Sequence, residues 1–178
     1  MNQTPNLAAI VVMGVSGSGK STLAKPLATR LGWPFVEGDD LHPDANVAKM
    51  RDRIALTDAD RAPWLAAIAA RIDGWRLAGR RGVVTCSALK RSYRIKLAGD
   101  AGDVRFVFLH GDQSELSRRL ELRTGHFMPA ALLPSQLATL EAPGPDEHAL
   151  WIDIHQPLES QIAAVLSGLN LHPAAPGA

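Results

Sequence analysis

Short apolar runs alternate along the chain with longer segments in which apolar residues recur every three or four positions. The runs are rich in β-branched and aromatic residues and occupy residues 8–13, 33–36, 82–87, 104–109 and 150–154. Short, continuous apolar runs of this kind are typical of strands that are buried on both faces. The pattern therefore predicts five strands inside a sheet that is covered on both sides.

Helices are predicted in the segments between these runs. Leu23, Leu27 and Leu31 follow one another at single-turn spacing, and a second series runs from Leu65 to Trp75. Further helices are predicted over 46–50, 90–97, 114–122, 135–140 and 158–169. Regular alternation of strands and helices implies parallel strands joined by right-handed crossovers. We expect an α/β fold, a three-layer α/β/α sandwich around a five-stranded parallel sheet.

Length and composition narrow the class of protein. The 178 residues suit a single domain, predicted over 1–172, with 173–178 as a small-residue tail that we expect to be disordered. A net charge of +1 argues against a general nucleic-acid-binding protein. One cysteine, Cys86, excludes an internal disulfide, and no run reaches the ~18 apolar residues of a membrane span. We expect a cytoplasmic protein without nucleic-acid or membrane partners.

The most specific motif follows the first predicted strand. Residues 14–21 read G-V-S-G-S-G-K-S, which fits the phosphate-binding loop G-x-x-x-x-G-K-[ST] at every specified position. The expected ATP-binding residues are Gly14, Val15, Ser16, Gly17, Ser18, Gly19, Lys20, Ser21 and Thr22. Lys20 would reach the β- and γ-phosphates, and the Ser21 hydroxyl would bind Mg²⁺. The alternative is a glycine-rich turn that binds nothing, which the flanking strand and helix disfavour.

Two carboxylates and a histidine follow the second predicted strand, at the edge of the sheet where ligands bind. Glu37 and Asp39 are two residues apart, so on an extended segment their side chains would point the same way. Asp39 is the candidate for contact with a substrate hydroxyl, and Glu37 is the candidate for the metal. Both could instead be loop carboxylates or helix caps. His42 is either a neutral donor to a substrate hydroxyl or a structural hydrogen-bonding group.

Cations occur at two further places that could bind an anionic substrate. Arg61 opens a predicted helix, where a positive charge is unfavourable without a partner. It could pair with Asp58 or Asp60, or it could bind a carboxylate of the substrate. Residues 90–94 contain three cations, beginning with Lys90. These either hold an anionic substrate or cover an ordinary helix surface.

A lid is predicted at about residues 118–134. Arg119 and Arg123 are four residues apart and share a helix face, and Gly125 and Pro129 bracket a segment able to hinge. Arginines brought in by closure would stabilise the negative charge of a transferring phosphoryl group while excluding water. The alternative is a surface helix with scattered arginines.

Together these motifs resemble the gluconokinase family, small P-loop carbohydrate kinases related to shikimate kinase and the nucleoside-monophosphate kinases. The resemblance spans about residues 11–158, and its most specific parts are G-D-D-L-H-P at 38–43, C-S-A-L-K at 86–90 and G-H-F at 125–127. It implies a P-loop kinase fold with a helical lid. It also implies phosphorylation of D-gluconate at its 6-hydroxyl by ATP and Mg²⁺, in a cytoplasmic homodimer.

The resemblance also assigns roles to individual residues. Catalysis would rest on Lys20, Asp39, Arg119 and Arg123. Gluconate would be bound by Asp39, His42, Arg61 and Lys90, and the metal by Ser21 and Glu37. The chain departs from the family pattern at Arg53 and Ala55, where a glycine and a proline are usual.

Two rival functions differ in the motifs that they require. A kinase of the same fold could act on another small hydroxy acid such as shikimate, but residues 87–89 are Ser-Ala-Leu where a glycine triplet would be expected. A nucleotide-dependent switch specific for guanine normally carries N-K-x-D after a late strand, and the sequence contains no Asn-Lys pair. A gluconokinase is therefore the favoured interpretation.

Overall fold

Five parallel strands form the centre of the molecule, in the order β2-β3-β1-β4-β5. They are β1 (Ala9–Met13), β2 (Phe35–Val36), β3 (Gly82–Thr85), β4 (Val104–His110) and β5 (Leu150–Asp153). This computed structural model describes residues 7–122 and 132–174. The predicted five-stranded parallel sheet is confirmed.

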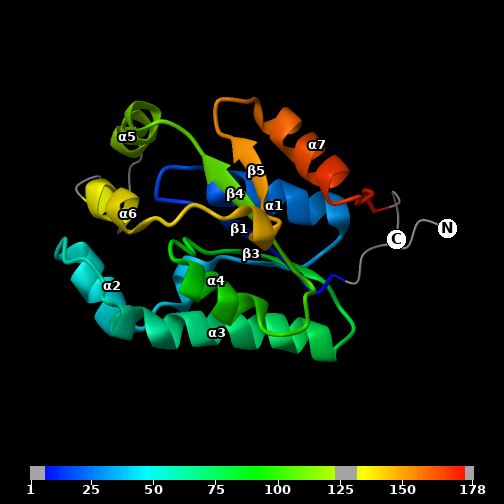
Figure 1. Ribbon diagram of the computed structural model, residues 1–178, viewed down its shortest axis with the longest axis horizontal. Helices are drawn as coiled ribbons and strands as arrows, with labels where there is room; N and C mark the ends of the chain where they lie inside the picture. Colours follow the sequence, from blue (N-terminus) through cyan, green and yellow to red (C-terminus); the bar gives the residue numbers. More distant parts are fainter. Residues whose placement is uncertain (1–6, 123–131, 175–178) are drawn as a thin grey trace.

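Helices cover both faces of the sheet and complete the three predicted layers (Figure 1). One face is covered by α1 (Lys20–Leu31) and α7 (Leu158–Gly168), and the other by α3 (Asp58–Leu77) and α4 (Arg91–Ala98). The remaining helices gather beside the carboxyl ends of the strands: α2 (Asp44–Arg51), α5 (Gln113–Glu121) and α6 (Leu133–Thr139). Among the described helices, none is both long and apolar enough to cross a membrane.

The hydrophobic core has two halves, one on each face of the sheet. Along β1, Ile10 and Val12 pack toward α1 and α7, whereas Val11 and Met13 pack toward α3 and α4. All four side chains are fully buried. Successive strand residues point to opposite faces, so a central strand with both faces covered needs a continuous apolar run. This explains the composition of the first strand.

The chain after β2 differs from the sequence prediction. The strand is shorter than predicted, and Gly38–Leu41 forms a 3-10 helix, η1. The prediction that Glu37 and Asp39 lie on an extended segment and point the same way was therefore wrong. The reason is a close backbone contact: a Cβ atom on Gly38 would overlap the carbonyl oxygen of Thr85 at the end of β3. A contact between distant backbone segments has no local signature.

The predicted lid and the domain limits stay predictions. Residues 123–131, which include most of the predicted lid, lie outside the described residues. The helix that leads into this segment, α5, ends at Glu121, and α6 begins at Leu133. Residues 1–6 and 175–178 also lie outside the described residues.

Candidate active site

The loop between β1 and α1 has the backbone geometry of a phosphate cradle. Gly14, Gly17 and Gly19 all have positive φ angles of 84–144°, which residues with a side chain rarely adopt. A Cβ atom on Gly17 would lie 2.9 Å from the Leu120 side chain and 3.0 Å from the Leu116 carbonyl oxygen in α5. The loop therefore packs directly on α5. Its amides, with the first turn of α1, can face an anion.

The predicted nucleotide-binding residues surround this loop. Lys20 is the first residue of α1, and its Nζ donates to the carbonyl oxygen of Val15 at 3.1 Å. Ser16 and Lys20 line a cleft beside the loop, Val15 and Ser18 are buried, and Ser21 and Thr22 lie in the first turn of α1. The arrangement fits the phosphates of a nucleotide. The individual assignments stay predictions.

Besides Ser16, the cleft brings together four of the predicted catalytic and substrate-binding residues. Lys20, Asp39, His42 and Arg61 all line it, although they come from α1, η1, the turn after η1, and α3. Asp39 is positioned by the tight turn at Gly38, whose carbonyl oxygen accepts a 2.7 Å hydrogen bond from Trp64 Nε1. A carboxylate, an imidazole and two cations thus share one cavity next to the phosphate loop.

His42 is held as a neutral hydrogen-bond donor. Its ring stacks on Trp64, with the centroids 4.1 Å apart and the planes 12° apart. Burial lowers the pKa of His42 from 6.5 to about 4. The Asn46 amide nitrogen lies 3.2 Å from Nδ1 and also donates to the Asp60 carbonyl oxygen at 2.8 Å. Because an amide nitrogen only donates, Nδ1 must accept, and the proton resides on Nε2.

Arg61 contacts an aromatic ring rather than either of the carboxylates proposed as its partners. Its guanidinium lies 5.8 Å from the centroid of Tyr93, and Nη1 is 3.4 Å from the Tyr93 hydroxyl. Asp60 forms a capping box with Thr57 at the start of α3. Asp58 accepts a hydrogen bond from the Tyr93 hydroxyl. Arg61 lines the cleft, where it can reach an anionic substrate.

Lys90 does not line the cleft in the described residues. Its Nζ bonds to both carboxylate oxygens of Asp58, at 2.8 and 2.9 Å. Further along α4, Arg94 is buried and pairs with Glu147 at 2.5 Å. It also donates to three backbone carbonyl oxygens. Arg94 is thus a structural cation that ties α4 to the segment before β5, and it does not hold a substrate.

Glu37 contacts the end of β3 and, unlike Asp39, does not line the cleft. It accepts a hydrogen bond from the Thr85 hydroxyl, which in turn accepts from Gly38 N at 3.0 Å. Within residues 7–122 and 132–174, no group of three or more His, Cys, Asp and Glu side chains could hold a metal ion. Mg²⁺ in kinase sites relies on one or two protein ligands, the substrate phosphates and water. Ser21 lies in the first turn of α1, and the metal-binding roles of Ser21 and Glu37 both stay predictions.

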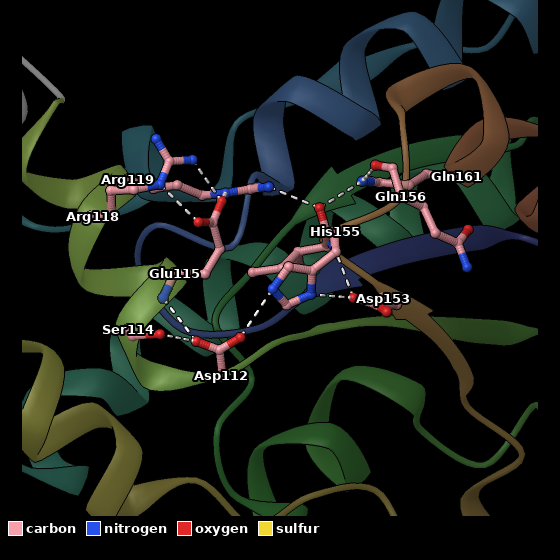
Figure 2. A network of polar contacts seen from close by, with 10 residues as sticks. Asp112, Ser114, Glu115, Arg118, Arg119, Asp153, His155, Gln156 and Gln161 are labelled. Atoms are coloured by element: carbon pink, nitrogen blue, oxygen red, sulfur yellow. Dashed lines mark hydrogen bonds and ion pairs between the residues drawn. The ribbon is translucent and has the colours of Figure 1, made fainter.

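Arg119 lies on α5, against the phosphate loop. Its Nη1 is 3.6 Å from the position that a Cβ atom on Gly19 would take. Figure 2 shows Arg119 among the polar contacts that link α5 with the end of β5. Arg123 lies outside the described residues, so its predicted role is not tested.

One buried contact in the site was missed by sequence reasoning. Gln136 on α6 accepts a 2.7 Å hydrogen bond from the backbone amide of Ser16, and its Nε2 lies 3.3 Å from the Ser16 hydroxyl. The two residues are 120 positions apart, and a glutamine in a short helix carries no signal of such a contact. Cys86 is fully buried in the core, and burial raises the pKa of its thiol to about 12.

The fold and the loop define the class of protein. A parallel sheet in this strand order, with a glycine-rich phosphate loop between β1 and α1, is the architecture of a P-loop nucleotide-binding protein. A protein-family model described as an AAA domain matches residues 10–143.

Individual relatives define the family within this class. The gluconokinase of Gluconobacter oxydans (strain 621H) is 61% identical over 143 residues, which cover 80% of each protein. The crystal structure of a gluconokinase from Sinorhizobium meliloti 1021 is 51% identical, with a TM-score of 0.82 and 91% of each chain covered. An unliganded sugar kinase from Janibacter sp. HTCC2649 is 46% identical, with a TM-score of 0.88 over 93% of this chain and 95% of that chain. The chain belongs to the gluconokinase family and is an ATP-dependent phosphotransferase.

Proposed function

We propose that this enzyme transfers the γ-phosphoryl group of ATP to the 6-hydroxyl of D-gluconate, giving 6-phospho-D-gluconate and ADP. The observation that carries the proposal is the cleft in which Lys20, Asp39, His42 and Arg61 meet beside the phosphate loop. Family membership supports the same substrate, because the relatives from Gluconobacter oxydans and Sinorhizobium meliloti are gluconokinases.

The chemistry of the cleft suits a sugar acid. The Arg61 guanidinium can bind a carboxylate through two parallel hydrogen bonds. The Nε2 proton of His42 can be donated to a substrate hydroxyl, because Asn46 occupies the other ring nitrogen. Asp39 would accept a hydrogen bond from the reacting hydroxyl and orient it toward the phosphate loop. Phosphoryl transfer has a loose transition state, so Asp39 needs to take the proton only late.

The nucleotide side supplies charge stabilisation. The amides of residues 14–22 and the Lys20 ammonium would bind the phosphates, and Arg119 and Arg123 would neutralise charge that develops during transfer. Mg²⁺ supplies further neutralisation of the β- and γ-phosphates when bound, and Ser21 and Glu37 are its proposed protein contacts. Alignment and electrostatics, rather than a strong base, would account for most of the acceleration.

An acceptor panel tests this function. Purified protein with ATP and Mg²⁺ is assayed for ADP formation in the presence of D-gluconate, shikimate, nucleoside monophosphates or no acceptor. The expected result is rapid ADP formation with gluconate and with none of the other acceptors. Such turnover would also exclude a nucleotide-dependent switch, which hydrolyses nucleotide slowly without a partner protein. ADP formation with shikimate but not with gluconate would overturn the assignment.

The assembly and the location of the enzyme are part of the same proposal. A homodimer in the cytoplasm is what the family resemblance implies for this chain. Light scattering coupled to size-exclusion chromatography is expected to give twice the 19.1 kDa mass of one chain. A mass of one chain at micromolar concentration would contradict the homodimer.

A further inference from the structure

The guanidinium of Arg119 is held on two sides. Its Nε donates to the Glu115 carboxylate at 2.6 Å, and its Nη2 donates to the backbone carbonyl oxygen of Ile154 at 2.8 Å (Figure 2). The remaining nitrogen, Nη1, is the one that lies beside Gly19 of the phosphate loop. Two contacts therefore direct the third nitrogen toward the place where the phosphates of ATP are proposed to bind.

The position and charge of Glu115 suit it to hold the Arg119 guanidinium in place. It lies one turn before Arg119 on α5, and its side chain is only 16% exposed. Hydrogen bonds from Arg118 and Arg119 lower the pKa of Glu115 to about 2, so the carboxylate is charged at any physiological pH. A free arginine side chain has ~2 kcal/mol of rotamer entropy, so a fixed partner reduces the cost of placing it for reaction.

The two elements that supply these contacts are also tied to each other. Asp112 caps α5 by accepting from Glu115 N at 2.9 Å. His155 bridges Asp112 and Asp153, with its two ring nitrogens 2.9 and 2.8 Å from their carboxylate oxygens (Figure 2). Ionised carboxylates only accept, so this bridge requires a proton on both nitrogens. The start of α5 is thereby fixed to the end of β5, next to Ile154.

We propose that Glu115 is a positioning residue for phosphoryl transfer, which holds the Arg119 guanidinium at the phosphate loop without touching either substrate. The inference deepens the proposed function and rests on it for the choice of acceptor. The placement of Arg119 against ATP, however, can be measured without an acceptor.

A matched pair of variants tests the proposal. Glu115→Gln keeps the size of the side chain but removes its charge, and Arg118→Gln removes the other partner of the same carboxylate. Arg118 is 60% exposed, so both variants lose the same surface ion pair and are expected to melt at similar temperatures. Only Glu115→Gln loosens Arg119. We expect it to lower kcat ~10-fold, which is less than the ~10²–10³-fold that follows loss of a transition-state-stabilising donor, because the guanidinium is loosened but still present. Arg118→Gln should stay within twofold of wild type.

A double-mutant cycle separates positioning from a general structural effect. Glu115→Gln is combined with Arg119→Ala, and kcat with gluconate and the Kd of ATP alone are measured for all four proteins. If Glu115 acts through Arg119, the double variant matches Arg119→Ala within about twofold in both quantities. The proposal would be overturned if the losses in kcat of the two single variants multiplied in the double variant. It would also be overturned if Glu115→Gln were indistinguishable from wild type. If wild type failed to phosphorylate gluconate, only the proposed acceptor would be refuted. The Kd values of ATP for the four proteins would still test the role of Glu115.

Discussion

At the scale of single residues, the site depends on side chains whose chemical state is set by their contacts. His42 stays neutral because it is partly buried and stacked on Trp64, and Asn46 directs its proton to Nε2. Asp39 reaches the same cleft because the turn at Gly38 is tight. A neutral donor and a carboxylate side by side can hold a hydroxyl through both its oxygen and its proton.

The role of Asp39 is tested by removing its charge. Asp39→Asn is expected to lower kcat by ~10²–10⁴-fold, the range found for groups that accept a proton, while the Kd of ATP changes less than twofold. The charge is proposed to act on the acceptor, so nucleotide binding should not depend on it. Steady-state kinetics and ATP titration measure both quantities. An equal loss of ATP affinity would assign Asp39 to the metal instead.

Arg53 occupies a backbone conformation that favours glycine. Its φ is 61°, and the amide of Ile54 bonds to the Lys49 carbonyl oxygen at 2.8 Å, which closes α2 with a left-handed residue. The family resemblance leads to the expectation of a glycine here, and the structure keeps the left-handed conformation with Arg53. We expect Arg53→Gly to raise the free energy of unfolding by about 0.5–1 kcal/mol. The substitution removes backbone strain of ~1–2 kcal/mol, and part of this gain is offset because glycine loses more conformational entropy on folding.

Chemical denaturation measures this change. Arg51→Gly is the matched control, because Arg51 is an exposed residue within α2 and its replacement should destabilise the protein. Equal destabilisation by both substitutions would show that the conformation of Arg53 carries no strain.

At the scale of elements, the phosphate loop, α1 and α5 form one unit. Gly17 rests on α5, Gly19 lies beside Arg119, and Lys20 opens α1. The contact of Gly17 with α5 leaves little space for a larger residue or a displaced helix. The unit therefore transmits the position of α5 to the nucleotide site.

Lys20 is the cation of this unit. Lys20→Ala is expected to reduce kcat by at least ~10³-fold, since the charge on the transferring phosphoryl group then lacks its main protein counterion. Circular dichroism and the melting temperature should stay close to wild type, because the side chain lies at the cleft. Near-normal turnover would refute the assignment of residues 14–22 to ATP.

His155 makes the link between α5 and β5 sensitive to pH. Hydrogen bonding to Asp153 raises the pKa of His155 above 6.5. A folded-state pKa that is raised gives stability that is fully present below the unfolded pKa and is lost as pH rises through the folded pKa. The melting temperature of wild type should therefore fall relative to His155→Gln as pH increases from about 6.5 toward 9.

Thermal unfolding between pH 5.5 and 9 checks this, with His172→Gln as the control. His172 is exposed near the end of the described chain, so its variant should keep the wild-type pH dependence. If the melting temperatures of wild type and His155→Gln changed in parallel with pH across this range, the result would contradict a charged His155 between Asp112 and Asp153.

At the scale of the whole molecule, ligand binding and folding are linked. The cleft is assembled from α1, η1, α3 and α6, so a ligand that binds it stabilises the native chain only. Binding at 100 times Kd adds about 2.7 kcal/mol of stability, and about 2–4 °C per kcal/mol is typical of this chain length. Saturating ATP with Mg²⁺ should thus raise the melting temperature by about 5–10 °C. A shift below 1 °C, with Lys20→Ala giving the same value, would exclude the proposed nucleotide site.

Much of this molecule could be predicted from local patterns. Strands and helices follow from hydrophobic periodicity, and the phosphate loop is a contiguous motif between β1 and α1. Confirmed predictions include the parallel sheet, the three layers and the gluconokinase family. The orientation of Glu37 was not predictable, because it is decided by Thr85, a residue 48 positions away.

By itself, the sequence determined the elements, the family and the phosphate loop, because backbone preferences and short motifs depend on neighbouring residues. Only the tertiary structure decided that Gln136 bonds to the loop at Ser16, and that Arg119 also bonds to the carbonyl oxygen of Ile154. Contacts of this kind depend on how crossovers pack distant segments at the carboxyl edge of the sheet. Packing geometry, and not local propensity, sets which polar groups meet there and which charge states they keep.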